Sequence, residues 1–206
     1  MELLDYKILA TGSKGNAVRI ESIMFDCGIP FKRMKEELYK CNTLCITHAH
    51  KDHINPSTLQ RIRKEFPRIQ IIANYDVAYT YPVDIVAGTK PIKLKRGITL
   101  YPFEGQHNLP VTGYVVDMKG LKILYATDTC KVINPIDDKL DYIFLESNYD
   151  EKKLRMIGSQ YIKKGYDPYA NAERHLSRER CKAFWFGNRR SPESPLIELH
   201  MSERFY

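Results

Sequence analysis

The segment 48–53 concentrates the residue types that bind metal ions: three histidines and one aspartate within six positions, namely His48, His50, Asp52 and His53. In an extended chain, residues two apart point the same way, so His48 and His50 can converge on one ion. Asp52 and His53 follow a bend and can face a second ion. Imidazole nitrogen and carboxylate oxygen suit zinc, and also manganese or iron. A polar loop with unrelated histidines is the alternative, and the close clustering argues against it.

The flanking residues place this segment between a strand and a helix. Residues 43–46 are apolar or β-branched and predict a short buried strand. Pro56 follows the segment and leads into Leu59, Ile62 and Phe66, which have helical spacing. The metal-type residues are therefore expected on a strand-to-helix loop.

Other parts of the chain repeat the pattern of an apolar strand followed by polar residues. The predicted strands 98–103, 121–125 and 195–199 are followed by His107, by Asp128 and by His200, respectively. The simplest grouping assigns two ions: the first with His48, His50 and His107, the second with Asp52, His53 and His200, and Asp128 between them. Two ions about 3.5–4 Å apart that share a water molecule are suited to hydrolysis.

The composition fits a soluble protein with one domain, residues 1–206. Hydrophobic residues make up 43% and charged residues 28%, and no apolar run approaches the roughly 20 residues that cross a bilayer. No membrane association is expected. The acidic start, Met1-Glu2-Leu3-Leu4-Asp5, lacks the features of a signal peptide, so a cytoplasmic location is expected.

The charge and the cysteines limit the partners and the chemistry. The net charge of +7 is compatible with an anionic substrate such as nucleic acid or a nucleotide. The five cysteines form no close CxxC pair, which favours free, mostly buried thiols over a disulfide framework.

Two segments near the N-terminus leave alternatives open. The glycine-rich residues 11–16 lie between two predicted strands and lack the spacing of a dinucleotide fingerprint, which favours a hairpin turn near the site over a phosphate-binding loop. Asp26 ends a short strand ahead of a predicted helix over 30–40. It is either a partner of a metal-binding histidine or a cap for that helix.

Several segments resemble the metallo-β-lactamase-fold hydrolases, and most closely the YycJ-like (WalJ-like) branch of bacteria and their phages. They are residues 12–16, 25–28, 48–53, His107 with Pro110 and Gly113, 125–129, 146–148, 175–177 and 200–203. The resemblance implies an α/β fold, the αββα sandwich of two mixed sheets flanked by helices, with the metals at one edge. It implies the same ligands as above and two divalent ions, with zinc the first choice and manganese the second. An aspartate at the position of Asp128 resembles the phosphodiesterase branches.

The same resemblance suggests roles in catalysis. Asp52 or Asp128 would orient the attacking water, and His175 would lie near the substrate phosphate and protonate the departing oxygen. The alternative for His175 is a surface histidine on a charged helix. Asn148 and Ser177 would touch the phosphate, or would simply cap and brace loops.

Two features depart from the family pattern. Tyr149 stands where relatives often have a histidine. The sequence also ends six residues after His200, whereas relatives commonly continue. The short end would either open the active site or leave its role to a second subunit, and a homodimer is the default expectation.

Three functions compete. The first is a metal-dependent phosphodiesterase acting on DNA or RNA, which the positive charge and the Lys- and Arg-rich segment 151–190 favour. The second is a phosphodiesterase for cyclic nucleotides, of the type that phages use against bacterial defence. The third is a metal-binding protein of the same fold without turnover. The complete ligand set argues against the third.

Overall fold

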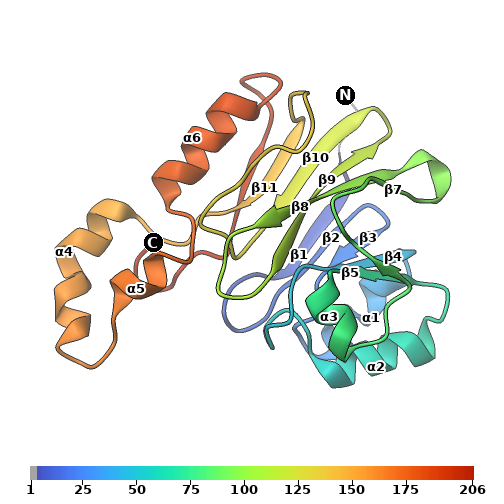
Figure 1. The fold of residues 1–206 in the computed structure, drawn as a ribbon, viewed down its shortest axis with the longest axis horizontal. Coiled ribbons are helices and arrows are strands. Elements are labelled where there is room, and N and C mark those ends of the chain that lie inside the picture. Colours follow the sequence, from blue (N-terminus) through green and yellow to red (C-terminus); the bar gives the residue numbers. More distant parts are fainter. Residues whose placement is uncertain (1–3) are drawn as a thin grey trace. The chain divides into compact units, whose positions relative to one another are not determined.

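The computed structural model describes residues 4–206, and the chain divides after Gly88 into two compact units (Figure 1). Each unit contains one six-stranded mixed sheet with helices, which confirms the predicted α/β class with two mixed sheets flanked by helices. The prediction of a single domain over 1–206 stays a prediction. In the described part of the chain, no helix has the length and apolar character needed to span a bilayer.

The sheet of the N-terminal unit has the order β1-β2-β3-β4-β5-β6. Its strands are β1 (Tyr6–Ala10), β2 (Ala17–Ile20), β3 (Ile23–Phe25), β4 (Thr43–Ile46), β5 (Gln70–Ala73) and β6 (Ile85–Val86). The first three strands pair antiparallel, and β3 to β6 pair parallel. The glycine-rich residues 11–16 connect β1 to β2, which confirms the predicted hairpin turn.

Three helices follow strands of this sheet: α1 (Phe31–Leu38), α2 (Pro56–Glu65) and α3 (Tyr75–Thr80). Because side chains alternate along a strand, Leu44 and Ile46 of β4 share one face of the sheet. They belong to a buried cluster with Met34 of α1 and with Leu59 and Ile62 of α2. Burial of these apolar faces holds α1 and α2 against the sheet and fixes the loop between β4 and α2.

The sheet of the C-terminal unit has the order β12-β11-β10-β9-β8-β7. Its strands are β7 (Ile92–Lys93), β8 (Thr99–Gly105), β9 (Val111–Met118), β10 (Leu121–Ala126), β11 (Tyr142–Glu146) and β12 (Leu196–Leu199). Strands β7 to β10 pair antiparallel, and β10, β11 and β12 pair parallel. Lys119 and Gly120 form the hairpin turn between β9 and β10, with both residues at positive φ as a tight turn requires.

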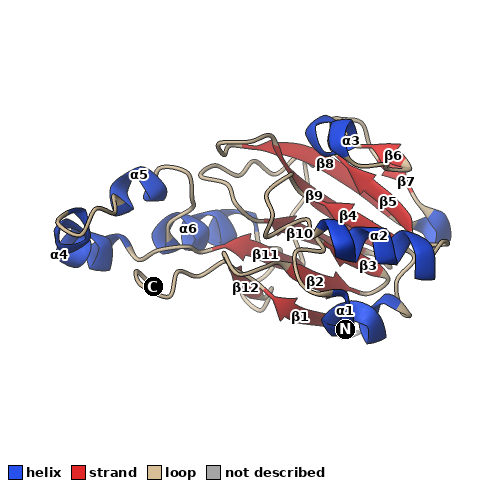
Figure 2. Ribbon diagram, turned by 90° about the horizontal axis from the view of Figure 1, so that it is seen from below, coloured by secondary structure: helices blue, strands red, loops and turns tan. Residues whose placement is uncertain are grey.

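Three helices lie in the C-terminal half of this unit. Helices α4 (Glu151–Ile162), α5 (Pro168–Ala172) and α6 (Arg178–Asn188) lie between β11 and β12 in the sequence, and Figure 2 shows α4 and α5 next to each other. Cys181 of α6 packs into a buried cluster with Ile143 and Leu145 of β11. A smaller cluster joins Leu154 of α4 to Ala172 and Phe205. Leu176 also belongs to the larger cluster, which therefore holds the segment before α6 against β11.

Candidate metal centre

In the N-terminal unit, polar residues follow three neighbouring parallel strands. Asp26 follows β3, residues 47–53 follow β4, and Asn74 follows β5. The carboxyl ends of parallel strands meet at one edge of a sheet, where ligand sites of α/β folds form. The Asn74 side chain donates to the Thr47 carbonyl (3.2 Å), which ties the start of α3 to the histidine-rich loop.

His48 and His50 face each other within this loop. His48 Nε2 and His50 Nδ1 lie 2.9 Å apart. Zn–N bonds are about 2.0–2.1 Å, so two nitrogens at this separation fit adjacent positions on one ion. The two side chains lie close together, as predicted.

Asp26 contacts the Nδ1 side of the His53 ring and fixes its orientation. Its Oδ2 lies 2.8 Å from His53 Nδ1, and its Oδ1 accepts hydrogen bonds from the backbone N–H (2.8 Å) and hydroxyl (3.0 Å) of Thr47. Burial raises the pKa of Asp26, and the bonds from His53 and Thr47 act in the opposite direction. Pro30 precedes α1 without a side-chain cap, so the helix-cap alternative for Asp26 is wrong. Asp26 is instead the partner that fixes a histidine, at the cost of a left-handed backbone (φ 62°).

The turn between β1 and β2 braces the other side of the loop. Asn16 Nδ2 donates to His53 Nε2 (2.8 Å), which presents that nitrogen as an acceptor, the state in which it would bind a metal. The backbone N–H of Asn16 donates to the Asp52 carbonyl (2.7 Å). A Cβ at Gly28 would lie 1.7 Å from that same carbonyl oxygen, so only glycine permits this approach. Asp52 Oδ2 lies 3.6 Å from His53 Nε2.

The C-terminal unit also has a sheet edge where polar residues lie at the ends of neighbouring parallel strands. Asp128 follows β10, Glu146 ends β11 and His200 follows β12, and the three strands are parallel neighbours. Asp128 Oδ1 lies 3.1 Å from His200 Nε2. Both residues have a positive φ, 51° and 54°, a strained backbone that directs their side chains toward this edge.

Glu146 connects this edge to His175. The carboxylate is buried, with Oε1 2.5 Å from His175 Nδ1 and Oε2 accepting from the backbone N–H of Thr129 (2.7 Å). Burial would raise the pKa of Glu146, but His175 and His200 bring it below its usual value, so it is a carboxylate. One donor atom from each of four residues, Asp128, Glu146, His175 and His200, lies within 4.8 Å of the others. Glu146 was not predicted as a site residue, although its place at the end of an apolar strand was the available signal.

His175 lies between α5 and α6 and is 8% exposed, so the alternative of a surface histidine on a helix is wrong. Its ring is centred 5.1 Å from that of His107. His107 comes shortly after β8, and its Nδ1 lies 3.0 Å from the Arg174 carbonyl oxygen, to which an Nδ1–H can donate. Burial lowers the pKa of His107 and favours the neutral imidazole that metals bind.

Asn148 and Ser177 both have structural roles. Asn148 Nδ2 lies 3.0 Å from His200 Nδ1 and donates to the His200 carbonyl (2.9 Å), so it braces this histidine. The Ser177 hydroxyl caps α6 by accepting from the Arg180 N–H (3.2 Å) and donates to Glu151 (2.7 Å). The predicted contact of either residue with substrate stays a prediction.

The thiols take no part in these clusters. All five cysteines are free, and Cys27, Cys45 and Cys181 are buried, as the sequence predicts. Burial raises the pKa of Cys181 to about 12 and that of Cys41 to about 12, which keeps them protonated and unreactive.

Residues 22–177 match the family described as "Beta-lactamase superfamily domain", and the chain belongs to this family. Its fold is the metallo-β-lactamase fold. No curated protein is a significant match to the sequence.

Solved structures of similar fold have low sequence identity. Human tRNase Z, short form, is 18% identical with a TM-score of 0.68, over 97% of this chain and 93% of that one. A diphosphatase from the PhnP family is 16% identical with a TM-score of 0.68, over 98% and 89%. Zn²⁺-bound PqqB from Methylobacterium extorquens is 8% identical with a TM-score of 0.62, over 96% and 89%. The His and Asp clusters of the present chain are of a kind that can bind metal ions.

Proposed function

We propose that the chain is a metal-dependent phosphodiesterase of the YycJ-like type, with DNA or RNA as the substrate. The observation that carries this proposal is the pair of polar sheet edges, one in each unit, in a member of the beta-lactamase superfamily. Fold relatives named as a tRNase and a diphosphatase support phosphate-containing substrates. The net charge of +7 favours a polyanion.

The donor set fits two divalent ions. One would be held by His48, His50 and His107, the other by Asp52, His53 and His200, with Asp128 shared. Neutral imidazoles and carboxylates suit zinc first and manganese second, and the zinc in PqqB supports that order. When bound, such ions lower the pKa of a water molecule and stabilise charge on phosphoryl oxygens.

The residues of the chain supply orientation and proton transfer. The carboxylate of Asp52 or Asp128 accepts a hydrogen bond from the attacking water and thereby orients it. His175 donates a proton from Nε2 to the departing oxygen, because its Nδ1 is already directed at Glu146 (2.5 Å). The carboxylate of Glu146 stabilises the imidazolium form that this step requires.

A substrate comparison tests the proposal. The purified protein, supplied with Zn²⁺ or Mn²⁺, is assayed with bis(p-nitrophenyl) phosphate, short single- and double-stranded DNA, RNA and 3′,5′-cyclic nucleotides. We expect hydrolysis of the diester and of oligonucleotides, with oligonucleotide binding that weakens steeply with salt. Turnover of cyclic nucleotides alone, without salt dependence, would contradict the nuclease assignment. No hydrolysis of any diester would contradict the enzyme assignment.

Two further expectations accompany this function. We also propose a homodimer and a cytoplasmic location. Sedimentation velocity at several concentrations tests the first.

A further inference from the structure

The C-terminal unit contains a hollow of about 440 Å³ among its helices. This volume lies within the range of about 300–1,000 Å³ that is typical of small-molecule sites. Its walls combine two arginines, two glutamates and two tyrosines: Arg155, Arg180, Glu151, Glu173, Tyr149 and Tyr169.

The hollow adjoins the donor cluster of this unit along the chain. Cys130, also in its wall, comes two residues after Asp128, and Glu173 comes two residues before His175. Tyr149 follows Asn148, whose side chain contacts the His200 ring. Three separate segments therefore lead from the cluster into the wall of the hollow.

Both arginines are exposed on the wall of the hollow, and the charge of Arg180 acts on the neighbouring Tyr149 phenol. Among residues 4–206, neither guanidinium forms an ion pair or a hydrogen bond, and the Arg180 bond to Ser177 comes from its backbone N–H. Arginine presents a planar fork of donors that matches the oxygens of a phosphate. Two arginines without an ion-pair partner in the wall of one hollow favour the binding of an anionic group.

The other wall residues indicate that this anion is part of a larger ligand. Glu151 accepts from Ser177 (2.7 Å) and Glu173 is exposed, so both carboxylates offer acceptors but would repel a bare anion. The phenol rings of Tyr149 and Tyr169 offer surfaces on which a base can stack. A nucleotide supplies all the matching groups: a phosphate, N–H and O–H donors, and an aromatic base.

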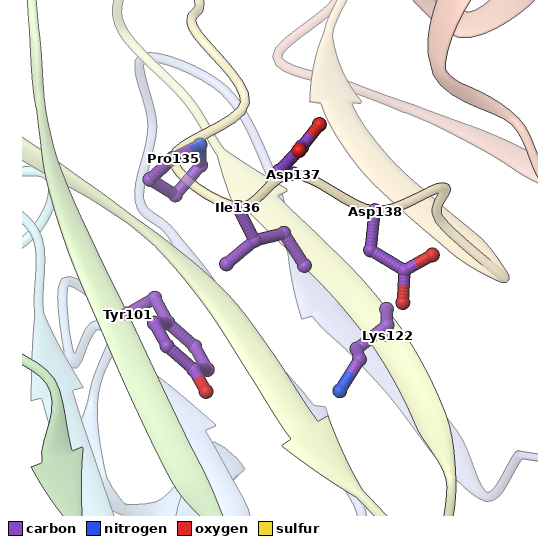
Figure 3. Close-up of a pocket in the computed structure, with 6 residues that line it drawn as sticks. All are labelled: Tyr101, Lys122, Pro135, Ile136, Asp137 and Asp138. Carbon is purple, nitrogen blue, oxygen red and sulfur yellow. The ribbon is translucent and has the colours of Figure 1, made fainter.

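A second hollow in the same unit serves as a comparison. It measures about 360 Å³ and is lined by Tyr101, Lys122, Pro135, Ile136, Asp137 and Asp138 (Figure 3). Its one cation, Lys122, already pairs with Asp117, and two aspartates line its wall. Lys122 is at the start of β10, whereas Asp128 follows the end of that strand. This second hollow has neither the charge nor the position for a substrate phosphate.

We infer that the 440 Å³ hollow binds the nucleotide adjacent to the scissile phosphodiester, with Arg155 and Arg180 on that nucleotide's own phosphate. This inference rests on the proposed function and specifies its substrate: a chain with a second phosphate beyond the one that is cleaved. A cyclic mononucleotide has only the scissile phosphate and leaves the two arginines without a partner.

The test compares two substrates in matched variants. A 5′-phosphorylated dinucleotide, in DNA and RNA forms, carries the second phosphate, and bis(p-nitrophenyl) phosphate does not. The variants are Arg155→Met, Arg180→Met and the double variant, with Arg180→Lys as the conservative change. Lys152→Met is the control, because Lys152 is an exposed cation on the same helix that does not line the hollow.

We expect each arginine-to-methionine change to lower the ratio of kcat/KM for the dinucleotide to that for the simple diester by about ten-fold. A charge-assisted hydrogen bond contributes roughly that factor. In Arg180→Lys this ratio should fall less than in Arg180→Met, and in Lys152→Met it should equal the wild-type ratio. An unchanged ratio in the double variant, with an unaltered circular dichroism spectrum, would overturn the inference.

A binding experiment separates this inference from the proposed function. If the wild-type protein hydrolyses neither substrate, the proposed function fails, but anisotropy of a dye-labelled 5′-phosphorylated dinucleotide still reports on the hollow. Weaker binding in the double variant than in Lys152→Met would support the nucleotide site. Equal binding in the two would overturn it.

Discussion

The donors of the N-terminal unit come from one loop, whereas those of the C-terminal unit come from the ends of four strands and a loop between helices. His48, His50 and His53 follow β4 within a few residues. In the C-terminal unit, Asp128 and His200 are separated by most of that unit's sequence and meet because β10, β11 and β12 are parallel neighbours. A contiguous motif sets its geometry locally, while a dispersed one depends on the whole sheet.

The residues that hold the histidines in place also differ between the two units. Asp26 follows the strand next to β4 and holds His53 through a direct bond of 2.8 Å. In the C-terminal unit, a buried carboxylate, Glu146, contacts His175, and a neutral amide, Asn148, contacts His200. His175 thus has a carboxylate partner and is not among the predicted metal ligands. For this reason we assign the proton transfer to His175.

The largest expected effect is loss of one predicted ligand from either unit. His50→Ala and Asp128→Ala should each abolish diester hydrolysis, because both units contribute to the same pair of ions in our proposal. Initial rates with bis(p-nitrophenyl) phosphate and metal content by inductively coupled plasma mass spectrometry measure this. Activity that survives in one of the two variants would show that a single unit holds the catalytic ion.

Replacing the proton donor should have a smaller effect. His175→Ala should slow hydrolysis about 10²–10⁴-fold, the usual contribution of general acid catalysis, with metal content close to that of the wild type. The effect should shrink for a substrate with a good leaving group, such as p-nitrophenol, because that group departs without a proton. Metal loss in His175→Ala as great as in His50→Ala would identify His175 as a ligand instead.

This difference between the units also explains what the sequence could predict. The loop 48–53 and its flanking strand and helix follow from local spacing, and the structure contains both elements, β4 and α2. Glu146 was missed because its partner, His175, lies 29 residues away, and only the packing of α6 against β11 brings them together. The role of Asp26 stayed open because a short strand followed by a helix fits a cap as well as a histidine partner, and only tertiary contacts decide between them.

Substitutions of Asp26 and Asn148, which hold histidines in place, should have smaller effects again. Asp26→Asn should reduce metal affinity about 10–100-fold, because the amide cannot hold the His53 N–H as the carboxylate does. Asn148→Ala should cost less, since a neutral amide contributes a weaker bond to His200. Competition with a fluorescent zinc chelator measures both affinities. A larger loss for Asn148→Ala than for Asp26→Asn would reverse the order inferred for the two supports.

The smallest effect on activity is expected from the charge network in the N-terminal unit. Glu37 is buried and interacts with Arg19 (2.7 Å), Lys7 (2.9 Å) and Lys40 (3.2 Å). Burial alone would raise the pKa of Glu37, but these three cations lower it to about 2. Because the folded pKa is depressed, the stabilisation is fully present above about pH 4.5 and is lost as the pH falls toward 2.

Glu37→Gln should therefore reduce the free energy of unfolding at pH 7 by about 3 kcal/mol while leaving the rate of diester hydrolysis at 25 °C unchanged. The difference from the wild type should shrink between pH 4.5 and 2. Urea unfolding followed by circular dichroism at a series of pH values measures this. A difference that is constant over that range would show that the charge of Glu37 is not its source.

Metal stoichiometry tests the central claim most directly. Freshly purified protein, dialysed against Zn²⁺ and then against metal-free buffer, is analysed for zinc per chain. We predict two ions per chain in the wild type, and fewer in both His50→Ala and Asp128→Ala. A chain that contains no transition metal and takes up none from solution would contradict the account.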